Sequence, residues 1–485
     1  MAETSAFVNY YARTGYFRHL QSVCNDGLKR RSTDQTLVFW RAFGMFKEGS
    51  IHEAIRDLEG IASRGDMQLA LPVNIALLHA HKASKVVDNE EVMRLEQEID
   101  LQDGNAPDRA RLLAAQLLWH LGDVSQAKDQ VLRLLELQSH SVPSLALLGW
   151  LELADVEAGD EFGTGLNDDN FISAERSFSK ALEASSSKKD LEALMGRARM
   201  HQLKGQYREA LDHLSQAIVT NSWYWPALIN KSHVHIAMGD WDQAIETADR
   251  VLSQEPQNID AVQIHVLHLL SQEARYALAS SRISELIDVL NRSEPQNAPL
   301  YYRIARNFSR LSGRNPEVLQ HTLKLMERAC KLANSTGSFA AELGYQHMLA
   351  GDIQAANASL KQASMLEAAS EDVVVHQTRC MILLNELDDA EQQLEFLSAT
   401  ALTRTPEMAL CSALISSQRG SSASAISLLD EALELHMPTV RDLAYCEDYF
   451  VKLKPDVILD IAHEYLKHFS TETEVRTRRL CARRP

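Results

Sequence analysis

Similar segments of this chain recur at a spacing of 34 residues. Gly205 and Tyr207 are followed by Gly239 and Trp241 at this distance, with alanines at matching positions after each pair. A 34-residue period with these residue types is typical of tetratricopeptide helix–turn–helix repeats. The spacing therefore predicts an all-α fold, a tetratricopeptide-type α-solenoid in which antiparallel helix pairs stack into a right-handed superhelix.

The same residue types mark further units before and after this pair. They predict a continuous array over residues 1–470, with about twelve units of which several are degenerate. In each unit a glycine lies in the turn, an aromatic residue can begin the second helix, and small residues let the two helices approach closely. The residues expected to pack the repeats are Gly15, Gly49, Ala54, Gly122, Ala127, Ala174, Phe178, Ala181, Gly205, Tyr207, Ala210, Ala217, Gly239, Trp241, Ala244, Gly344, Gly351, Ala356, Ala390, Gly420 and Ala425.

Four segments depart from the regular pattern. Residues 156–170 are acidic and rich in glycine, which predicts an exposed loop between two helices of one unit. The unit over 68–107 is degenerate, with a helix expected across 69–84 and then a charged stretch. Residues 438–470 are expected to form a last helical pair. The tail 471–485 is basic, without an apolar period, and is predicted to be disordered.

The composition excludes several classes of protein. There are 66 acidic and 49 basic residues, a net charge of −17, which argues against binding to nucleic acid or to an anionic membrane surface. No apolar run approaches the roughly 20 residues that a spanning helix needs. The N-terminus does not have the pattern of a signal peptide. The six cysteines form no paired motif and are expected to be reduced thiols of a cytosolic protein.

Groups that could carry chemistry have plainer interpretations. Histidines two apart on a helix point to different faces, and a third close pair has no further ligand nearby, so no metal site is predicted. These pairs are His79 with His81, His233 with His235, and His265 with His268. The glycines at 163–165 are followed by no lysine and sit among acidic residues, which favours a loop over a phosphate site. Cys330, Cys380 and Cys411 fall in apolar helical stretches and are expected in the core. We therefore predict no catalytic residue and no cofactor.

The aromatic cluster at 223–226 (Trp-Tyr-Trp-Pro) leaves two alternatives open. It can be a packed turn between two repeats, or it can lie exposed in a binding groove. The packed turn is the plainer interpretation.

Several stretches are more specific than the repeat pattern. They are NYYARTGYFRH (9–19), WDQAIETADRVLSQEPQNIDAV (241–262), AELGYQHMLAGDIQAA (341–356), DDAEQQLEFL (388–397) and DYFVKLKPDVILDIAHEYL (448–466). Together they resemble the tetratricopeptide repeat protein twenty-one family, the large repeat subunit of intraflagellar transport complex A. The resemblance runs from about residue 9 to 468 and corresponds to an N-terminal portion or short isoform of a longer protein.

The resemblance implies a non-catalytic scaffold of cilium assembly and retrograde ciliary transport. Its expected partners are the other complex A subunits and ciliary cargo adaptors, with no nucleic acid and no membrane insertion. The expected locations are the cytoplasm and the cilium, at its axoneme and base. Family geometry places possible groove contacts on the first helices of two units: Met195, Arg199, Gln202, Ile229, His233 and Ile236.

Two other functions are weighed against the scaffold. A chaperone-type adaptor that captures peptide C-termini needs lysine, arginine and asparagine side chains converging in one groove. The two best units offer mostly methionine, isoleucine and histidine. An enzyme carrying the array as an accessory needs a catalytic domain, for which the repeats leave no room.

Overall fold

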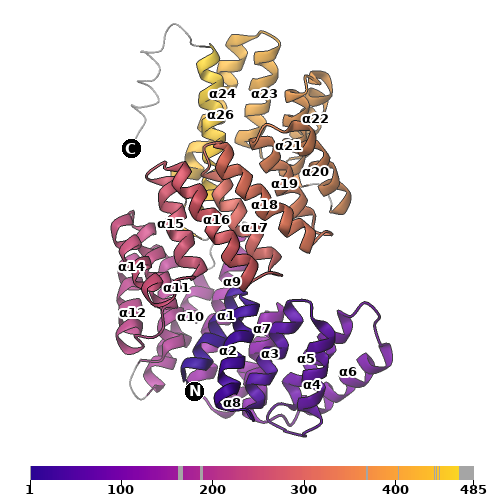
Figure 1. The fold of residues 1–485 in the computed structure, drawn as a ribbon, viewed down its shortest axis with the longest axis vertical. Helices are drawn as coiled ribbons and strands as arrows, with labels where there is room; N and C mark the ends of the chain where they lie inside the picture. The colour runs from indigo at the N-terminus through magenta and orange to yellow at the C-terminus, as the bar shows by residue number, and fades with distance from the viewer. Residues whose placement is uncertain are drawn as a thin grey trace. The chain divides into compact units, whose positions relative to one another are not determined.

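The structure is a computed structural model that describes residues 2–468 apart from 162–167, 186–188, 368–369, 402, 442, 444 and 447. The described residues form α-helices joined by short turns and contain no β-strand (Figure 1), which confirms the predicted all-α repeat fold. Contacts divide the chain into two compact units. Unit 1 comprises Met1–Ile264 and Val289–Asn297, and unit 2 comprises His265–Asp288 and Ala298–Pro485. The prediction was of one continuous array.

The helices follow one another as antiparallel pairs. Those of unit 1 are α1 (Ala2–Thr14), α2 (Phe17–Arg30), α3 (Gln35–Lys47), α4 (Ile51–Ala62), α5 (Ala70–Lys82), α6 (Asn89–Asp103), α7 (Asp108–Leu121), α8 (Val124–Leu137), α9 (Val142–Glu161), α10 (Asp168–Ala184), α11 (Leu191–Leu203), α12 (Tyr207–Thr220), α13 (Pro226–Ala237) and α14 (Trp241–Gln254). Two helices have parts in both units: α15 (Ile259–Ser271) and α16 (Tyr276–Ser293). Unit 2 continues with α17 (Ala298–Arg310), α18 (Pro316–Leu332), α19 (Gly337–Leu349), α20 (Ile353–Leu366), α21 (Glu371–Leu383), α22 (Leu387–Thr400), α23 (Pro406–Gln418), α24 (Ser422–Arg441), α25 (Tyr449–Leu453) and α26 (Pro455–His468).

Many turns within the pairs contain a glycine, and in three of them an aspartate follows it and caps the next helix. Gly239 has a φ of 76°, a left-handed conformation that glycine adopts without steric cost. Asp240 follows, and its carboxylate accepts a hydrogen bond from the amide of Gln243 in the first turn of α14. The other predicted turn glycines have φ values between 70° and 98°: Gly15, Gly49, Gly122, Gly205, Gly351 and Gly420.

The small residues of the repeats lie where the two helices of a pair meet. The predicted packing alanines are all 0% exposed, as is Phe178: Ala54, Ala127, Ala174, Ala181, Ala210, Ala217, Ala244, Ala356, Ala390 and Ala425. Tyr207 and Trp241 are half-buried first residues of α12 and α14. Gly344 lies within α19, where an added Cβ would come 2.7 Å from the Leu360 side chain. Close helix contact therefore depends on these small side chains.

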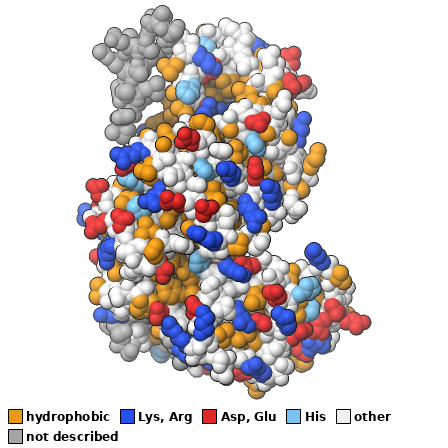
Figure 2. All heavy atoms as spheres, in the orientation of Figure 1, with side chains coloured by type: hydrophobic (Ala, Val, Ile, Leu, Met, Phe, Trp, Pro, Cys, Tyr) orange, Lys and Arg blue, Asp and Glu red, His pale blue; other side chains and the backbone are white. Residues whose placement is uncertain are grey.

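Two segments expected to be irregular are helical. The predicted loop 156–170 was wrong at both ends, since α9 continues to Glu161 and α10 begins at Asp168; its centre, 162–167, lies outside the described residues. The expected helix at 69–84 is α5, and the charged stretch after it forms α6. Asp88 caps α6 at the amides of Glu90 and Glu91. Figure 2 shows acidic side chains gathered over this helix.

The last helices differ from the predicted pair. α24 runs to Arg441 with Pro438 inside it, and α25 has only five residues before Pro455 begins α26. The tail 471–485 lies outside the described residues. No helix in the described part of the chain is both long and apolar enough to cross a membrane.

Replacing Gly196 by alanine tests the packing of α9, α10 and α11. A methyl group at Gly196 would overlap the buried Phe178 ring, and one at Gly149 would come 2.6 Å from the same ring. We expect Gly196→Ala to lower the free energy of unfolding by about 1–3 kcal/mol, as overpacking does. The measurement is the urea midpoint followed by circular dichroism.

Gly60→Ala is the matched control. Gly60 lies on the exposed side of α4 with no atom within 4 Å of an added Cβ. This change should raise stability by about 0.5–1 kcal/mol, because alanine favours the helix. Equal effects of the two substitutions would contradict the packing described here.

Candidate interaction surfaces

Helix α1 packs against helices that lie far away in the sequence of unit 1. Arg13 forms an ion pair with Glu192 at 3.0 Å, and Asn9 donates a hydrogen bond to the same carboxylate. The hydroxyls of Tyr10 and Tyr16 both donate to Asp260. Burial, and then the Asp260 carboxylate, raises the pKa of Tyr10, so this hydroxyl keeps its proton and remains a donor. The middle and the C-terminal end of α1, and the turn that follows it, are therefore tied to later repeats.

The aromatic cluster at 223–226 is a packed turn covered by α1. The ring of Phe7 lies 5.7–5.9 Å from the rings of Trp223, Tyr224 and Trp225. Tyr224 and Trp225 are only 1% and 6% exposed. Of the two alternatives, the packed turn is confirmed. Aromatic clusters of this kind contribute beyond the area they bury, because tilted rings pair their edges with faces.

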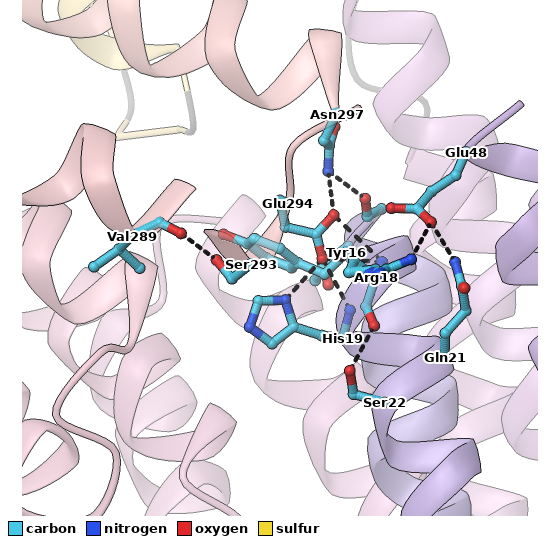
Figure 3. A network of polar contacts seen from close by, with 12 residues as sticks. Tyr16, Arg18, His19, Gln21, Ser22, Glu48, Val289, Ser293, Glu294 and Asn297 are labelled. Carbon is cyan, nitrogen blue, oxygen red and sulfur yellow. Dashed lines mark hydrogen bonds and ion pairs between the residues drawn. The ribbon is translucent and has the colours of Figure 1, made fainter. Parts of the chain in front are cut away.

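The N-terminus of helix α2 is capped by the carboxylate of Glu294 (Figure 3). The N-cap residue Tyr16 makes no side-chain cap. Glu294, which is 0% exposed, accepts hydrogen bonds from the amides of Arg18 and His19, at 3.1 and 3.0 Å, and lies 2.7 Å from Nδ1 of His19. Asn297 donates to the carbonyl of Gly15. A buried anion at a helix N-terminus satisfies amides that have no partner within the helix.

A cavity of about 580 Å³ lies in unit 1 between α1, α2, α3, α7, α9 and the start of α11. One wall is an aromatic ladder, defined here as Trp40, His120, Trp119 and Trp150. Neighbouring rings in it have centroids 5.0–6.3 Å apart, and the Arg13 guanidinium lies 4.1 Å over Trp150. A cavity of this size with an aromatic wall has the usual dimensions of a ligand or peptide pocket.

Three further arginines line this cavity. Arg31 pairs with Asp34 at 3.8 Å, and Arg109 donates to the hydroxyl of Thr36. Arg30 and Arg109 are exposed, and neither has a carboxylate partner in the described part of the chain. The pocket therefore combines an apolar wall with cationic groups that a ligand can reach.

Most of the predicted groove contacts do not face an open groove. Met195, Gln202, Ile229 and Ile236 are between 1% and 7% exposed and pack inside the array, so this part of the prediction was wrong. Arg199 is half-buried and pairs with Glu157 at 2.7 Å, and His233 is also half-buried. For these two residues a contact with a partner stays a prediction.

In unit 2 the two residues that flank α25, and Asp460 of α26, form ion pairs with residues on or next to the first helices of earlier repeats. Asp448 pairs with Arg306 of α17, and Lys454 pairs with Glu407 of α23, each at 2.5 Å. Asp460 is held by Arg379 of α21 and by Arg314, which follows α17. A cavity of about 320 Å³ remains between these helices and α19.

The cavity of about 320 Å³ in unit 2 is lined by charged side chains, several of which are buried. Arg310 pairs with Glu342 at 2.7 Å, and its guanidinium lies 4.0 Å over the Tyr345 ring. Burial, together with Arg310, Arg379 and Lys454, lowers the pKa of His376 well below its usual value. This histidine is therefore neutral at physiological pH.

Three buried cysteines of the described chain have thiols of raised pKa. Burial raises the pKa of Cys24 and Cys411 to about 12 and that of Cys380 to about 11. These thiols stay protonated, which is the unreactive form. Cys330 is half-buried in α18 and Cys481 lies outside the described residues, as do the glycines at 163–165.

Comparison with known families decides the assignment. Residues 8–245 match the N-terminal ARM repeat of tetratricopeptide repeat protein 21, and residues 281–482 match its second ARM domain. The chain belongs to the tetratricopeptide repeat protein 21 family. The repeat-based scaffold is the type of architecture that this family shares.

Relatives in the family extend over nearly all of this chain. It is 32% identical to human tetratricopeptide repeat protein 21B over 476 residues, which are 96% of this chain and 34% of the relative. It is 33% identical to mouse tetratricopeptide repeat protein 21A over 96% of this chain and 34% of that relative. The Caenorhabditis elegans homolog is 23% identical over 80% of this chain and 28% of its own length. The chain therefore spans about a third of the length of the mammalian members.

Solved helical-repeat structures are more distant. Yeast Tom70 is 14% identical, with a TM-score of 0.42, over 90% of each chain. The Cut9–Hcn1 hetero-tetramer of APC/C contains a chain that is also 14% identical, with a TM-score of 0.33, over 97% of this chain and 94% of that one.

Three residues of the unit 1 network were not predicted. Glu192 and Asp260 have no feature in the sequence that separates them from other acidic residues of the repeats, whereas Glu294 lies in a repeated motif. One signal was available: the SEPQN segment at 293–297 echoes QEPQN at 254–258. In the earlier copy, Asn258 accepts a hydrogen bond from the amide of Ala261 and caps α15.

Replacing Glu294 tests the docking of α2. Glu294→Ala removes the buried acceptor of two backbone amides and of His19, so that these donors lose their partner. We expect the free energy of unfolding to fall by about 2–4 kcal/mol, from roughly 1–3 kcal/mol for each orphaned group. Glu285→Ala in the same helix removes an exposed ion pair with Arg282 and should change stability by less than about 1 kcal/mol. Equal urea midpoints for the two variants would rule out the cap.

The pH dependence of stability in a His120 variant tests the burial of this residue in the aromatic ladder. Burial, with Arg13 and Lys47, lowers the pKa of His120 from 6.5 to about 3. Between these values the unfolded chain binds a proton that the folded chain does not, so stability is lost as pH falls. In His120→Phe we expect a shallower loss between pH 6 and 4, by up to about 1.4 kcal/mol per pH unit. The exposed His52→Phe serves as the control, and an unchanged slope in His120→Phe would contradict the prediction.

Proposed function

We propose that this chain is an interaction scaffold of intraflagellar transport complex A, acting in retrograde ciliary transport, cilium assembly and protein localisation to the cilium. The observation that carries the proposal is family membership across 96% of the chain at 32% identity to human tetratricopeptide repeat protein 21B. The stretches at 388–397 and 448–466, which resemble the family most specifically, add support.

The proposed partners are the other subunits of complex A and, through them, ciliary cargo adaptors. The chain covers about a third of the mammalian relatives, so partners that bind the rest of such a protein belong to a different surface. The proposed places of action are the cytoplasm, the ciliary base and the axoneme. A stack of helix pairs suits a scaffold that acts by binding alone. Its affinity for a partner protein then comes from a few side chains that become buried at the interface.

The unit 1 cavity is the proposed place for such an anchor. Its aromatic ladder offers apolar contact, and Arg30 and Arg109 offer charge to a partner's carboxylates. Arginine and tryptophan are the side chains that most often dominate binding energy at protein interfaces.

The chaperone-type adaptor is the second candidate, and the same cavity is what favours it. Arg13, Arg30, Arg31 and Arg109 all line it, together with four acidic residues, which the sequence pattern did not indicate. A peptide's free C-terminal carboxylate could bind between such groups.

A pull-down from ciliated cells tests the two candidates. The full chain, tagged, should retain the other complex A subunits, identified by mass spectrometry. Arg30→Glu with Arg109→Glu should reduce their recovery at least tenfold, because the two substitutions repel acidic anchors. The control is Arg56→Glu with Arg64→Glu, which makes the same charge change at exposed positions on and after α4.

Recovery of chaperones alone, with tighter binding of a peptide acid than of its amide, would favour the second candidate. Recovery of no complex A subunit by the folded chain would contradict the scaffold proposal.

A further inference from the structure

One face of α26 carries an acidic stripe that is buried. Asp456, Asp460 and Glu464 follow each other at four-residue spacing and lie on one side of the helix. They are 6%, 7% and 3% exposed. Acidic side chains are almost never buried to this extent unless they are paired. The face that covers them must therefore be a surface suited to carboxylates.

The polar partners of this stripe lie on or beside the first helices of three helix pairs of unit 2, α17, α21 and α23, while the apolar residues of α26 pack on α23 and α24. Asp460 is held by two arginines, Arg314 and Arg379. Glu464 accepts a hydrogen bond from the hydroxyl of Ser417 in α23 at 2.5 Å. Ahead of the stripe, Asp448 pairs with Arg306. Helices α17, α21 and α23 thus each contribute at least one group that binds an acidic residue of the segment 448–464.

The match between α26 and this face is incomplete. Both carboxylate oxygens of Asp456 are buried without a hydrogen-bond partner, and burial raises the pKa of this side chain. Next to α25 and α26, a cavity of about 320 Å³ remains, lined by Arg306, Arg310 and Arg379. An unpaired buried carboxylate weakens the docking of the helix that carries it. The helix in place is therefore mismatched to the face at this one position, although its Val457 and Ile461 are buried in a core cluster with α23 and α24.

We propose that the face formed by α17, α19, α21 and α23 binds an amphipathic helix of a protein partner with acidic residues at four-residue spacing, and that α25 and α26 occupy it in cis. The partner is recognised by the arginines that now hold Asp448 and Asp460, and it competes with α26 for them. This proposal concerns the chemistry of one groove and stands independently of the ciliary assignment.

The test uses a labelled peptide of residues 448–468 and the full chain, with affinity measured by fluorescence anisotropy. Asp460→Asn in the chain weakens the cis helix and should tighten peptide binding at least tenfold over the wild type. Asp389→Asn, the same change at an exposed position of α22, should leave binding at the wild-type level. A peptide with Asp460→Asn and Glu464→Gln should bind the Asp460→Asn chain at least tenfold more weakly. Adding Arg379→Gln to that chain should abolish binding.

Equal affinities of wild-type and Asp460→Asn chains, with native circular dichroism spectra, would overturn the proposal and leave α26 as a structural helix. Equal binding of the two peptides would overturn recognition of the acidic stripe. If Asp460→Asn does not fold, hydrogen exchange of the wild-type chain decides the question. Excess acidic peptide should speed exchange in residues 455–468, and unchanged exchange would overturn the proposal.

Discussion

The arrangement of unit 1 depends on one buried carboxylate. Helix α2 starts without a side-chain cap of its own, and the amides of Arg18 and His19 would remain unsatisfied in a buried place. Glu294, from a segment 275 residues later, accepts both. Helix capping contributes about 0.5–2 kcal/mol, and here it also sets which later repeat the N-terminal pair contacts. The contacts of α1 with Glu192 and Asp260 follow from that placement.

The local fold could be predicted from the sequence because its causes are local. Turn glycines such as Gly239 and buried alanines such as Ala244 recur at a fixed period, and each repeat packs mainly on its neighbours. The contacts of α1 could not be predicted, because they join residues with no shared period. The prediction of groove contacts was wrong because the place of a residue within the repeat does not determine its exposure. Ile229 and Met195 are both buried in the folded array. The helix over 156–161 was missed because glycine and acidic residues lower helix propensity without excluding a helix.

Both units have helices of the chain itself on surfaces that repeat proteins use for binding. In unit 1 the occupant is α1, held by tyrosine hydroxyls and an aromatic cluster. In unit 2 the occupants are α25 and α26, held by ion pairs. Each mode leaves one buried polar group without a hydrogen-bond partner, the hydroxyl of Tyr224 in unit 1 and the carboxyl group of Asp456 in unit 2. In our proposal the occupant of the unit 2 surface exchanges with a partner helix.

Hydrogen exchange of the full chain, resolved by mass spectrometry to the N-terminal peptides, tests the central claim most directly. If Glu294 and Asp260 hold the N-terminal pair against later repeats, amides of residues 4–14 exchange as slowly as those of α13. Exchange of these amides at the rate of an unstructured peptide, in a chain whose α13 is protected, would contradict the account.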